Sequence, residues 1–220
     1  MVARQVIVFD MDGVLVDVSE SYRETIVRTV EHFTGQRITR DRIQEYKNAG
    51  GWNNDWALSQ RVCGDLGTEV AYQAIVDHFN DLFLNQGLIH RERWLPKNGF
   101  FEALAGRFDL AIFTGRNQLE AGITLDRQRC RDKFSTIIGS DDVEHGKPHP
   151  EGLLKVAALY PGARLLYVGD TIDDARSASG ANVPFIGVAG PETPRRDEVI
   201  TLLQSEGAIR VLCDINELCS

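Results

Sequence analysis

Apolar residues along the chain gather in six short runs, and the segments between the runs are mixed in polarity. The runs are Val6–Phe9, Leu110–Phe113, Thr136–Ile138, Leu165–Val168, Phe185–Val188 and Arg210–Leu212. They are nearly continuous rather than alternating, which is typical of strands that are covered on both faces. Helical patterns lie between them, so we expect an α/β fold in which a parallel sheet carries helices on both faces.

The first two predicted strands are separated by far more chain than one connection requires. A strand–helix–strand unit takes about 30 residues, whereas 104 positions separate Asp10 from Thr114 (114 − 10). The surplus is mostly helical in pattern, because it lacks the composition of a long loop. We therefore expect a helical insertion over residues 17–95, and a sheet domain formed by residues 1–16 and 96–220.

Two helices are expected within this insertion. Ser21 and Glu24 fit a capping box, apolar residues follow at helical spacing, and Gly35 is expected to end that helix. Thr68 is expected to cap a second helix, whose apolar positions run from Val70 to Phe83. The insertion is thus predicted to be a small helical domain.

Composition and charge exclude several classes of protein. The chain has 220 residues, of which 43% are hydrophobic and 25% charged, and these are ordinary values for a globular protein. The 32 acidic residues outnumber the 24 lysines and arginines, so the net charge is −8. We expect no binding to nucleic acid or to an anionic membrane. We also expect no transmembrane helix and no signal peptide, because Asp10 and Asp12 interrupt the first apolar run.

The spacing of cysteine and histidine residues predicts neither a disulfide nor a metal site. We expect the cysteines to be small buried residues in a reducing, cytoplasmic setting; they are Cys63, Cys130, Cys213 and Cys219. The histidines show no spacing typical of a pair of metal ligands; they are His32, His78, His90, His145 and His149.

Candidate chemistry lies where the predicted strands end, because ligands of parallel sheets bind outside the carboxyl ends of the strands. Asp10 and Asp12 follow the first strand, and Thr114 follows the second. Lys147 lies beyond the third strand. The fourth is followed by three acids, Asp170, Asp173 and Asp174.

Each of these residues alone has an ordinary explanation, since aspartate is common in turns and at helix N-termini. Several carboxylates at one edge of a sheet, however, repel each other and resist the loss of water. A divalent cation such as Mg²⁺ relieves that conflict, because it prefers carboxylate, water and phosphate oxygens as ligands. A lysine and a hydroxyl beside the metal suit a bound anion.

Four segments of the chain resemble the motifs of the haloacid-dehalogenase-like (HAD) hydrolase superfamily. They are VIVFDMDGVLVD, IFTGR, GKPHPE and YVGDTIDD, in that order, and the match runs from about residue 5 to residue 190. The insertion after the first segment resembles the helical cap of one subfamily. The resemblance implies a Rossmann-like core with a small α-helical cap domain. It also implies a cytoplasmic, Mg²⁺-dependent phosphatase, a monomer or a homodimer, that acts on a small phosphorylated metabolite.

The resemblance further implies roles for individual residues. Asp10 would attack phosphorus to form an aspartyl-phosphate, and Asp12 would act as general acid and base. Asp10, the backbone carbonyl of Asp12, and Asp170 would hold Mg²⁺, while Asp173 or Asp174 would support these ligands. The phosphoryl group would be bound by Thr114, Gly115 and Lys147.

Two alternatives to the phosphatase stay open. A sugar-phosphate mutase of the same superfamily would form the same phospho-Asp10 and return the phosphoryl group to its bound substrate. A HAD-like binding protein would have lost catalysis, although the intact motif residues speak against it. Asp12 argues against the branches that remove halide or cleave phosphonoacetaldehyde.

Substrate choice is expected to depend on the insertion. Its segment GGWNNDW resembles a set within the helical-cap subfamily, some members of which are fused to histidine-biosynthesis enzymes. This segment either closes over a substrate or is a helix-to-helix turn, with Asn54 as a helix cap and the tryptophans packed inside the insertion. The candidate specificity residues are Lys47, Trp52, Asn53, Asn54 and Arg116.

Overall fold

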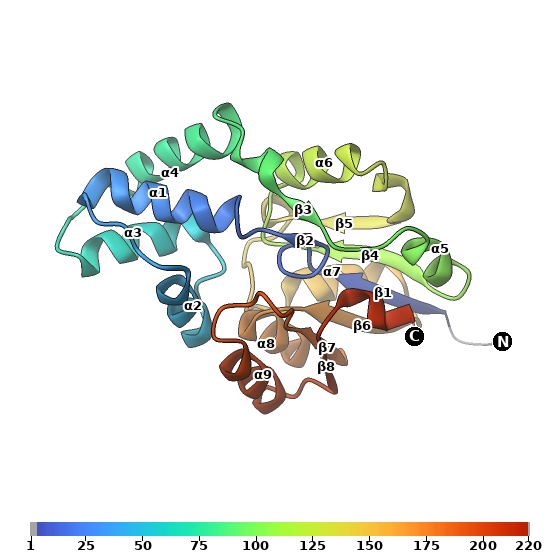
Figure 1. Cartoon of the computed structure of the whole chain (residues 1–220). Helices are drawn as coiled ribbons and strands as arrows, with labels where there is room; N and C mark the ends of the chain where they lie inside the picture. Colours follow the sequence, from blue (N-terminus) through green and yellow to red (C-terminus); the bar gives the residue numbers. More distant parts are fainter. Residues whose placement is uncertain (1–3, 220) are drawn as a thin grey trace. The chain divides into compact units, whose positions relative to one another are not determined.

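The chain divides into two compact units in a computed structural model that describes residues 4–219 (Figure 1). The first, here called the sheet unit, comprises Met1–Val16 and Trp94–Ser220, and the second, the helical unit, comprises Asp17–Arg93. The chain passes between them through β2 (Val16–Asp17) and β3 (Arg93–Trp94), which form a two-stranded sheet. The helical unit ends two residues before the end of the predicted insertion, residues 17–95; its role as a cap stays a prediction.

A six-stranded parallel sheet forms the centre of the sheet unit. The strand order is β5-β4-β1-β6-β7-β8, and neighbouring strands pair in parallel. The strands match the six predicted apolar runs to within one residue at each end, which confirms the expected α/β, Rossmann-like fold. Their bounds are β1 Gln5–Phe9, β4 Asp109–Phe113, β5 Thr136–Ile138, β6 Arg164–Gly169, β7 Phe185–Val188 and β8 Arg210–Leu212.

Both faces of this sheet are covered by helices, which explains why its strands are apolar throughout. Successive side chains of a strand point to opposite faces. Val6 and Val8 of β1 join a core with buried residues of α7, α8 and α9, whereas the ring of Phe9 contacts Phe100 of α5 at a centroid distance of 6.1 Å. The helices are α5 Phe100–Ala105, α6 Gln118–Arg127, α7 Glu151–Leu159, α8 Ile172–Gly180 and α9 Arg196–Ser205. Short 3₁₀ turns lie at Arg131–Lys133, Ser140–Asp142 and Ile215–Cys219.

The helical unit has a core of aromatic side chains. The ring of Phe83 lies 4.1 Å from that of Tyr22, and the ring of Phe79 lies within 6.3 Å of both. All three side chains are buried. The helices of the unit are α1 Tyr22–Thr34, α2 Arg40–Ala49, α3 Asp55–Asp65 and α4 Tyr72–Asn80, followed by a π-helical turn at Asp81–Asn85 and a 3₁₀ turn at Leu88–Arg91.

The capping box predicted for α1 does not form, although the helix begins beside Ser21 and ends at Gly35 as expected. The hydroxyl of Ser21 is buried and has no hydrogen-bond partner among the described residues. Glu24 does not reach back to the helix start, because it pairs with Arg28 at 2.8 Å and with Arg37 at 3.1 Å. A carboxylate forms stronger hydrogen bonds with two charged guanidinium groups than with one neutral backbone N–H.

The start predicted at Thr68 for the second helix of the insertion is wrong. The helix α4 begins at Tyr72, and Ala71 is its N-cap. Thr68 instead belongs to the end of α3, where its backbone N–H donates to the carbonyl of Cys63 at 2.9 Å. The intervening Gly67 has a φ of 83°, which suits the left-handed turn that closes a helix.

The cysteine prediction is right for two of the four residues. Cys63 and Cys130 are buried, but Cys213 and Cys219 are exposed because they follow the last strand in a surface segment. The thiol of Cys213 accepts a hydrogen bond from Arg196 at 2.9 Å. Within residues 4–219, no helix combines the length and apolarity needed to cross a membrane.

Candidate active site

The turn after β1 places carboxylates at the carboxyl end of the sheet. The backbone N–H of Asp10 donates to the carbonyl of Val168 on β6 at 2.8 Å, so the pairing of β1 with β6 extends to Asp10. Gly13 closes this turn with a φ of 74°. A Cβ atom at Gly13 would lie 2.0 Å from Oδ2 of Asp170. The glycine therefore serves both the left-handed backbone and the close approach of the Asp170 carboxylate.

Lys147 lies between two buried carboxylates. Its Nζ is 2.8 Å from Oδ1 of Asp10 and 2.7 Å from Oδ1 of Asp174, and its side chain is only 1% exposed. The ammonium also lies 5.1 Å from the centroid of the Phe113 ring and 5.6 Å from that of Tyr167. Both carboxylates and both aromatic faces favour a cation at this position.

Asp174 is held in place by the start of α8. Its Oδ2 accepts a hydrogen bond from the backbone N–H of Thr171 at 3.0 Å, and its own N–H donates to the hydroxyl of Thr171 at 3.2 Å, which together form a capping box. The same hydroxyl donates to Oδ2 at 2.6 Å. Its Oδ1 accepts a hydrogen bond from the phenol of Tyr167 at 2.7 Å. Asp174 thus positions Lys147 from the helix end, whereas Asp173 is buried in the first turn of the same helix.

Burial and charge shift the pKa values of these groups in opposite directions. Burial raises the pKa of Asp10 to about 7, because the nearby Lys147 only partly offsets the loss of water. Burial also opposes ionisation of Asp174, but the ion pair with Lys147 and the hydrogen bonds hold its pKa below the ordinary range. Burial would lower the pKa of Lys147, yet the two carboxylates raise it well above the usual lysine value.

Three carboxylates in this cluster have the chemistry of a Mg²⁺ site. Oxygen atoms of Asp10, Asp170 and Asp174 lie within 4.8 Å of one another. With Lys147 included, their formal charge is −3 + 1 = −2, which one divalent cation balances. Carboxylate oxygens are the ligands that Mg²⁺ prefers in proteins, so these residues fit that ion.

Arg116 is directed at Asp12. Its side chain is fully buried; Nε and Nη2 donate to Oδ1 of Asp12, the former at 2.8 Å, and Nη1 donates to the hydroxyl of Thr124 at 2.8 Å. Asp12 is partly exposed, with 31% of its side chain accessible. A planar guanidinium bonded in this way fixes the position of its partner.

The segment after β4 places Thr114 and Gly115 beside this pair. Thr114 is buried, its N–H donates to the carbonyl of Ile138, and its hydroxyl accepts a hydrogen bond from the N–H of Arg116 at 3.2 Å. Gly115 is exposed. The helix that follows, α6, is capped by Asn117 rather than by Thr114, so the threonine hydroxyl is not used as a helix cap.

The specificity candidates of the helical unit have structural contacts within that unit. Lys47 pairs with Asp55 at 2.6 Å, and both side chains are largely buried. The ring of Trp52 packs edge-on against Tyr46, with the centroids 6.1 Å apart. Asn54 caps α3, as one of the two readings of GGWNNDW predicted, and Asn53 is half-buried.

Two features of this part of the chain escaped sequence reasoning. The phenol of Tyr167, in the middle of β6, holds Asp174, and its signal in the sequence is an aromatic residue within the apolar run Leu165–Val168. The sequence shows no histidines at the spacing of metal ligands, yet the rings of His145 and His149 lie 4.8 Å apart in the structure. Their four-residue separation in a loop gives no periodic signal for such contact.

Comparisons with known proteins agree with this geometry. The model of the haloacid dehalogenase-like hydrolase family matches residues 7–188. An imidazoleglycerol-phosphate dehydratase from Phytophthora nicotianae is 33% identical in an alignment 201 positions long, which covers 86% of this chain and 44% of that protein. The chain therefore spans less than half the length of this relative. A phosphoglycolate phosphatase from Mesorhizobium japonicum is 25% identical in an alignment 196 positions long, which covers 84% of this chain and 83% of that protein.

Solved structures share the fold. A candidate β-phosphoglucomutase from Thermotoga maritima is similar with a TM-score of 0.68 and 22% sequence identity, and the match covers 98% of this chain and 96% of that one. At this level of identity the likeness concerns the fold alone.

Proposed function

Because the chain belongs to the haloacid dehalogenase-like hydrolase family, we propose that it hydrolyses the phosphomonoester of a small metabolite through an aspartyl-phosphate on Asp10. The observation that carries this proposal is the ion pair of Lys147 with Asp10, 2.8 Å long and buried at the carboxyl end of the sheet. A buried ammonium there can neutralise charge that gathers on a phosphoryl group as it transfers. The phosphatase relative supports the reaction class.

In the first step that we propose, an oxygen of the Asp10 carboxylate attacks phosphorus. The bond from phosphorus to the ester oxygen breaks, and Asp12 gives its proton to the leaving alcohol. In the second step Asp12 takes a proton from water, whose oxygen attacks the aspartyl-phosphate. The bond from phosphorus to Asp10 breaks, inorganic phosphate forms, and the Asp10 carboxylate is restored.

Arg116 acts in this scheme as a positioning residue for Asp12. Its hydrogen bonds go to Oδ1 of Asp12, so Oδ2 is the oxygen that we assign to proton transfer. The guanidinium is buried and held by Thr124. This placement favours a role for Arg116 in positioning Asp12. The sequence had suggested that Arg116 contacts the substrate.

Thr114, Gly115 and Lys147 are the groups that we assign to the phosphoryl oxygens. Asp10, the backbone carbonyl of Asp12, and Asp170 would hold Mg²⁺, which when bound supplies positive charge beside the phosphoryl group. Within the helical unit, Trp52 and Asn53 stay our candidates for substrate contact. Lys47 and Asn54 are assigned to the folding of that segment, because Asp55 and the start of α3 engage them.

The test is hydrolysis of a generic aryl phosphate, with Mg²⁺ and with EDTA. We expect release of phosphate only with Mg²⁺, loss of activity in Asp10→Asn, and full activity in Asp132→Asn, a matched change at an exposed acid. A panel of phosphometabolites, including phosphoglycolate and imidazoleglycerol phosphate because relatives carry those names, identifies the substrate. Absence of turnover across the whole panel would refute the proposed phosphatase activity and favour a binding protein.

A mutase of the same superfamily is the second candidate, since it would use the same phospho-Asp10. The two reactions differ in their products. A phosphatase releases inorganic phosphate, whereas a mutase converts one sugar phosphate to its isomer and keeps the phosphate ester intact. Product analysis of sugar phosphates by ³¹P spectroscopy therefore separates them. Asp12→Asn adds a test of mechanism, because it should slow substrates with poor leaving groups more than those with good ones.

A further inference from the structure

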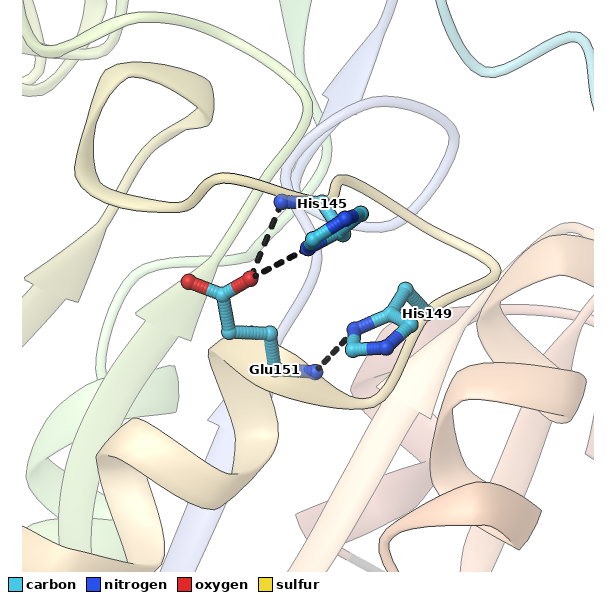
Figure 2. A group of neighbouring side chains, drawn as sticks. All are labelled: His145, His149 and Glu151. Atoms are coloured by element: carbon cyan, nitrogen blue, oxygen red, sulfur yellow. Dashed lines mark hydrogen bonds and ion pairs between the residues drawn. The ribbon is translucent and has the colours of Figure 1, made fainter.

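Two histidines and a glutamate lie together on the loop that carries Lys147. Figure 2 shows the rings of His145 and His149 side by side, with the carboxylate of Glu151 turned toward His145. The ring centroids are 4.8 Å apart and the ring planes are inclined by 37°. One ligand atom from each of the three residues lies within 4.8 Å of the others.

The glutamate of this cluster is fixed and its charged form is stabilised. Glu151 is the first residue of α7. Its Oε2 accepts a hydrogen bond from the N–H of His145 at 2.9 Å, and its Oε1 accepts one from the N–H of Glu144 at 3.0 Å. Lys155, one helical turn on, pairs with Oε1 at 2.8 Å. The carboxylate is thus held toward the imidazole of His145 before any ligand binds.

The two imidazoles are exposed, and their hydrogen bonds to other described residues are long. Nδ1 of His145 lies 3.3 Å from Oε2 of Glu151, and Nδ1 of His149 accepts from the N–H of Glu151 at 3.3 Å. Hydrogen bonds of this length are weak. Rotation of either ring toward a shared ligand therefore breaks only a weak hydrogen bond.

We propose that His145, His149 and Glu151 form a binding site for a divalent transition-metal ion, with Zn²⁺ as the reference ion. Two imidazole nitrogens and one carboxylate oxygen suit Zn²⁺, with a fourth position left for water. Mg²⁺ prefers oxygen ligands, so we assign it to the separate carboxylate cluster that contains Asp10 and Asp170. The two sites are distinguished by ligand chemistry.

The position of the site gives it a mechanical consequence. His145 lies two residues before Lys147 and His149 lies two residues after it. An ion held by both histidines ties the two arms of the loop to each other and, through Glu151, to α7. We therefore expect Zn²⁺ to slow amide hydrogen exchange in the segment 144–150.

Calorimetric titration of Zn²⁺ into the full chain, in excess Mg²⁺, tests the proposal. Every protein in the series carries Cys213→Ser and Cys219→Ser, because exposed thiolates bind Zn²⁺ themselves. We expect one equivalent bound, affinity lowered about tenfold or more by Glu151→Gln, and binding lost in the double variant His145→Ala/His149→Ala. Hydrogen exchange of 144–150 should respond to Zn²⁺ in the parent protein and not in the double variant.

Two controls make the result specific. The rings of His32 and His78 in the helical unit are also stacked, 3.9 Å apart, so His32→Ala/His78→Ala is a matched loss of a histidine pair and should leave binding unchanged. Asp170→Asn weakens the carboxylate cluster and should also leave Zn²⁺ binding intact. Binding that survives loss of His145 and His149, or that disappears in either control, overturns the proposal. The readout is binding, so it stands or falls independently of the proposed phosphatase.

Discussion

Replacing Lys147 by methionine removes the cation that pairs with both Asp10 and Asp174. Methionine keeps most of the volume of the side chain but none of its charge. Both carboxylates lie within 2.8 Å of the ammonium, and all three side chains are buried. Loss of one partner of a buried ion pair costs about 3–5 kcal/mol, because the other charge is left uncompensated.

A cost of this size is large for a single substitution. At about 2–4 °C per kcal/mol for a chain of this length, it lowers the Tm by about 6–20 °C. The matched control is Lys133→Met, which removes an exposed pair with Glu102 whose Nζ–Oε1 distance is 3.0 Å. Such surface pairs contribute about 0–1 kcal/mol to stability, so the control should unfold at a Tm close to that of the parent protein.

The loss should also depend on pH in a defined direction. Burial raises the pKa of Asp10 to about 7 from an ordinary 3.8, and Lys147 opposes that rise; without the lysine, the pKa rises further. A carboxyl group whose pKa is raised by folding destabilises the protein as pH increases through the folded value. Lys147→Met should therefore lose more stability at about pH 8.5 than at about pH 5.5, where Asp10 is protonated in the variant.

Urea unfolding in EDTA, followed by circular dichroism at both pH values, measures these differences. A loss in Lys147→Met no larger than that in Lys133→Met would refute the reasoning. An equal loss at both pH values would show that the uncompensated carboxylate charge is not the cause.

Two further predictions concern a glycine and the cysteines. In Gly13→Ala the φ is 74° and the new Cβ would lie 2.0 Å from Asp170, whereas in Gly99→Ala the φ is 85° and the Cβ would meet open space. Gly13→Ala should therefore lower the free energy of unfolding by about 1–3 kcal/mol more than Gly99→Ala. Equal losses in urea unfolding would contradict the steric argument. Burial raises the pKa of the Cys130 thiol to about 12. A thiol-specific alkylating reagent should therefore label the exposed Cys213 at once, and Cys130 only on unfolding. Rapid labelling of both cysteines in the native protein would contradict the packing described.

The strands were predictable because the sheet is covered on both faces. In β1, Val6 and Val8 pack on one side while Phe9 packs on the other, and the result in sequence is a continuous apolar run. The helix starts were less predictable. Ser21 and Glu24 have the residue types of a capping box, but the glutamate pairs instead with Arg28, one turn on in the same helix, and with Arg37 beyond the helix end.

The strand-end carboxylates were predictable because the ends of parallel strands meet at one edge of the sheet. Their partners were not. Arg116 lies 104 positions from Asp12 and was assigned to substrate contact, but its buried bond to that aspartate depends on the packing of α6. The pair of His145 and His149 depends on how one loop folds back on itself. Sequence spacing carries no information about either contact.

The most direct test of the proposed mechanism is an acid quench of the enzyme during turnover of a ³²P-labelled phosphomonoester with Mg²⁺. We predict a protein-bound phosphoryl group that is stable to acid, is released by hydroxylamine, and maps by peptide mass spectrometry to Asp10. Asp10→Asn should bind the substrate without acquiring the label. Turnover by the parent protein with no protein-bound phosphoryl group, or with the label on another residue, would contradict the account.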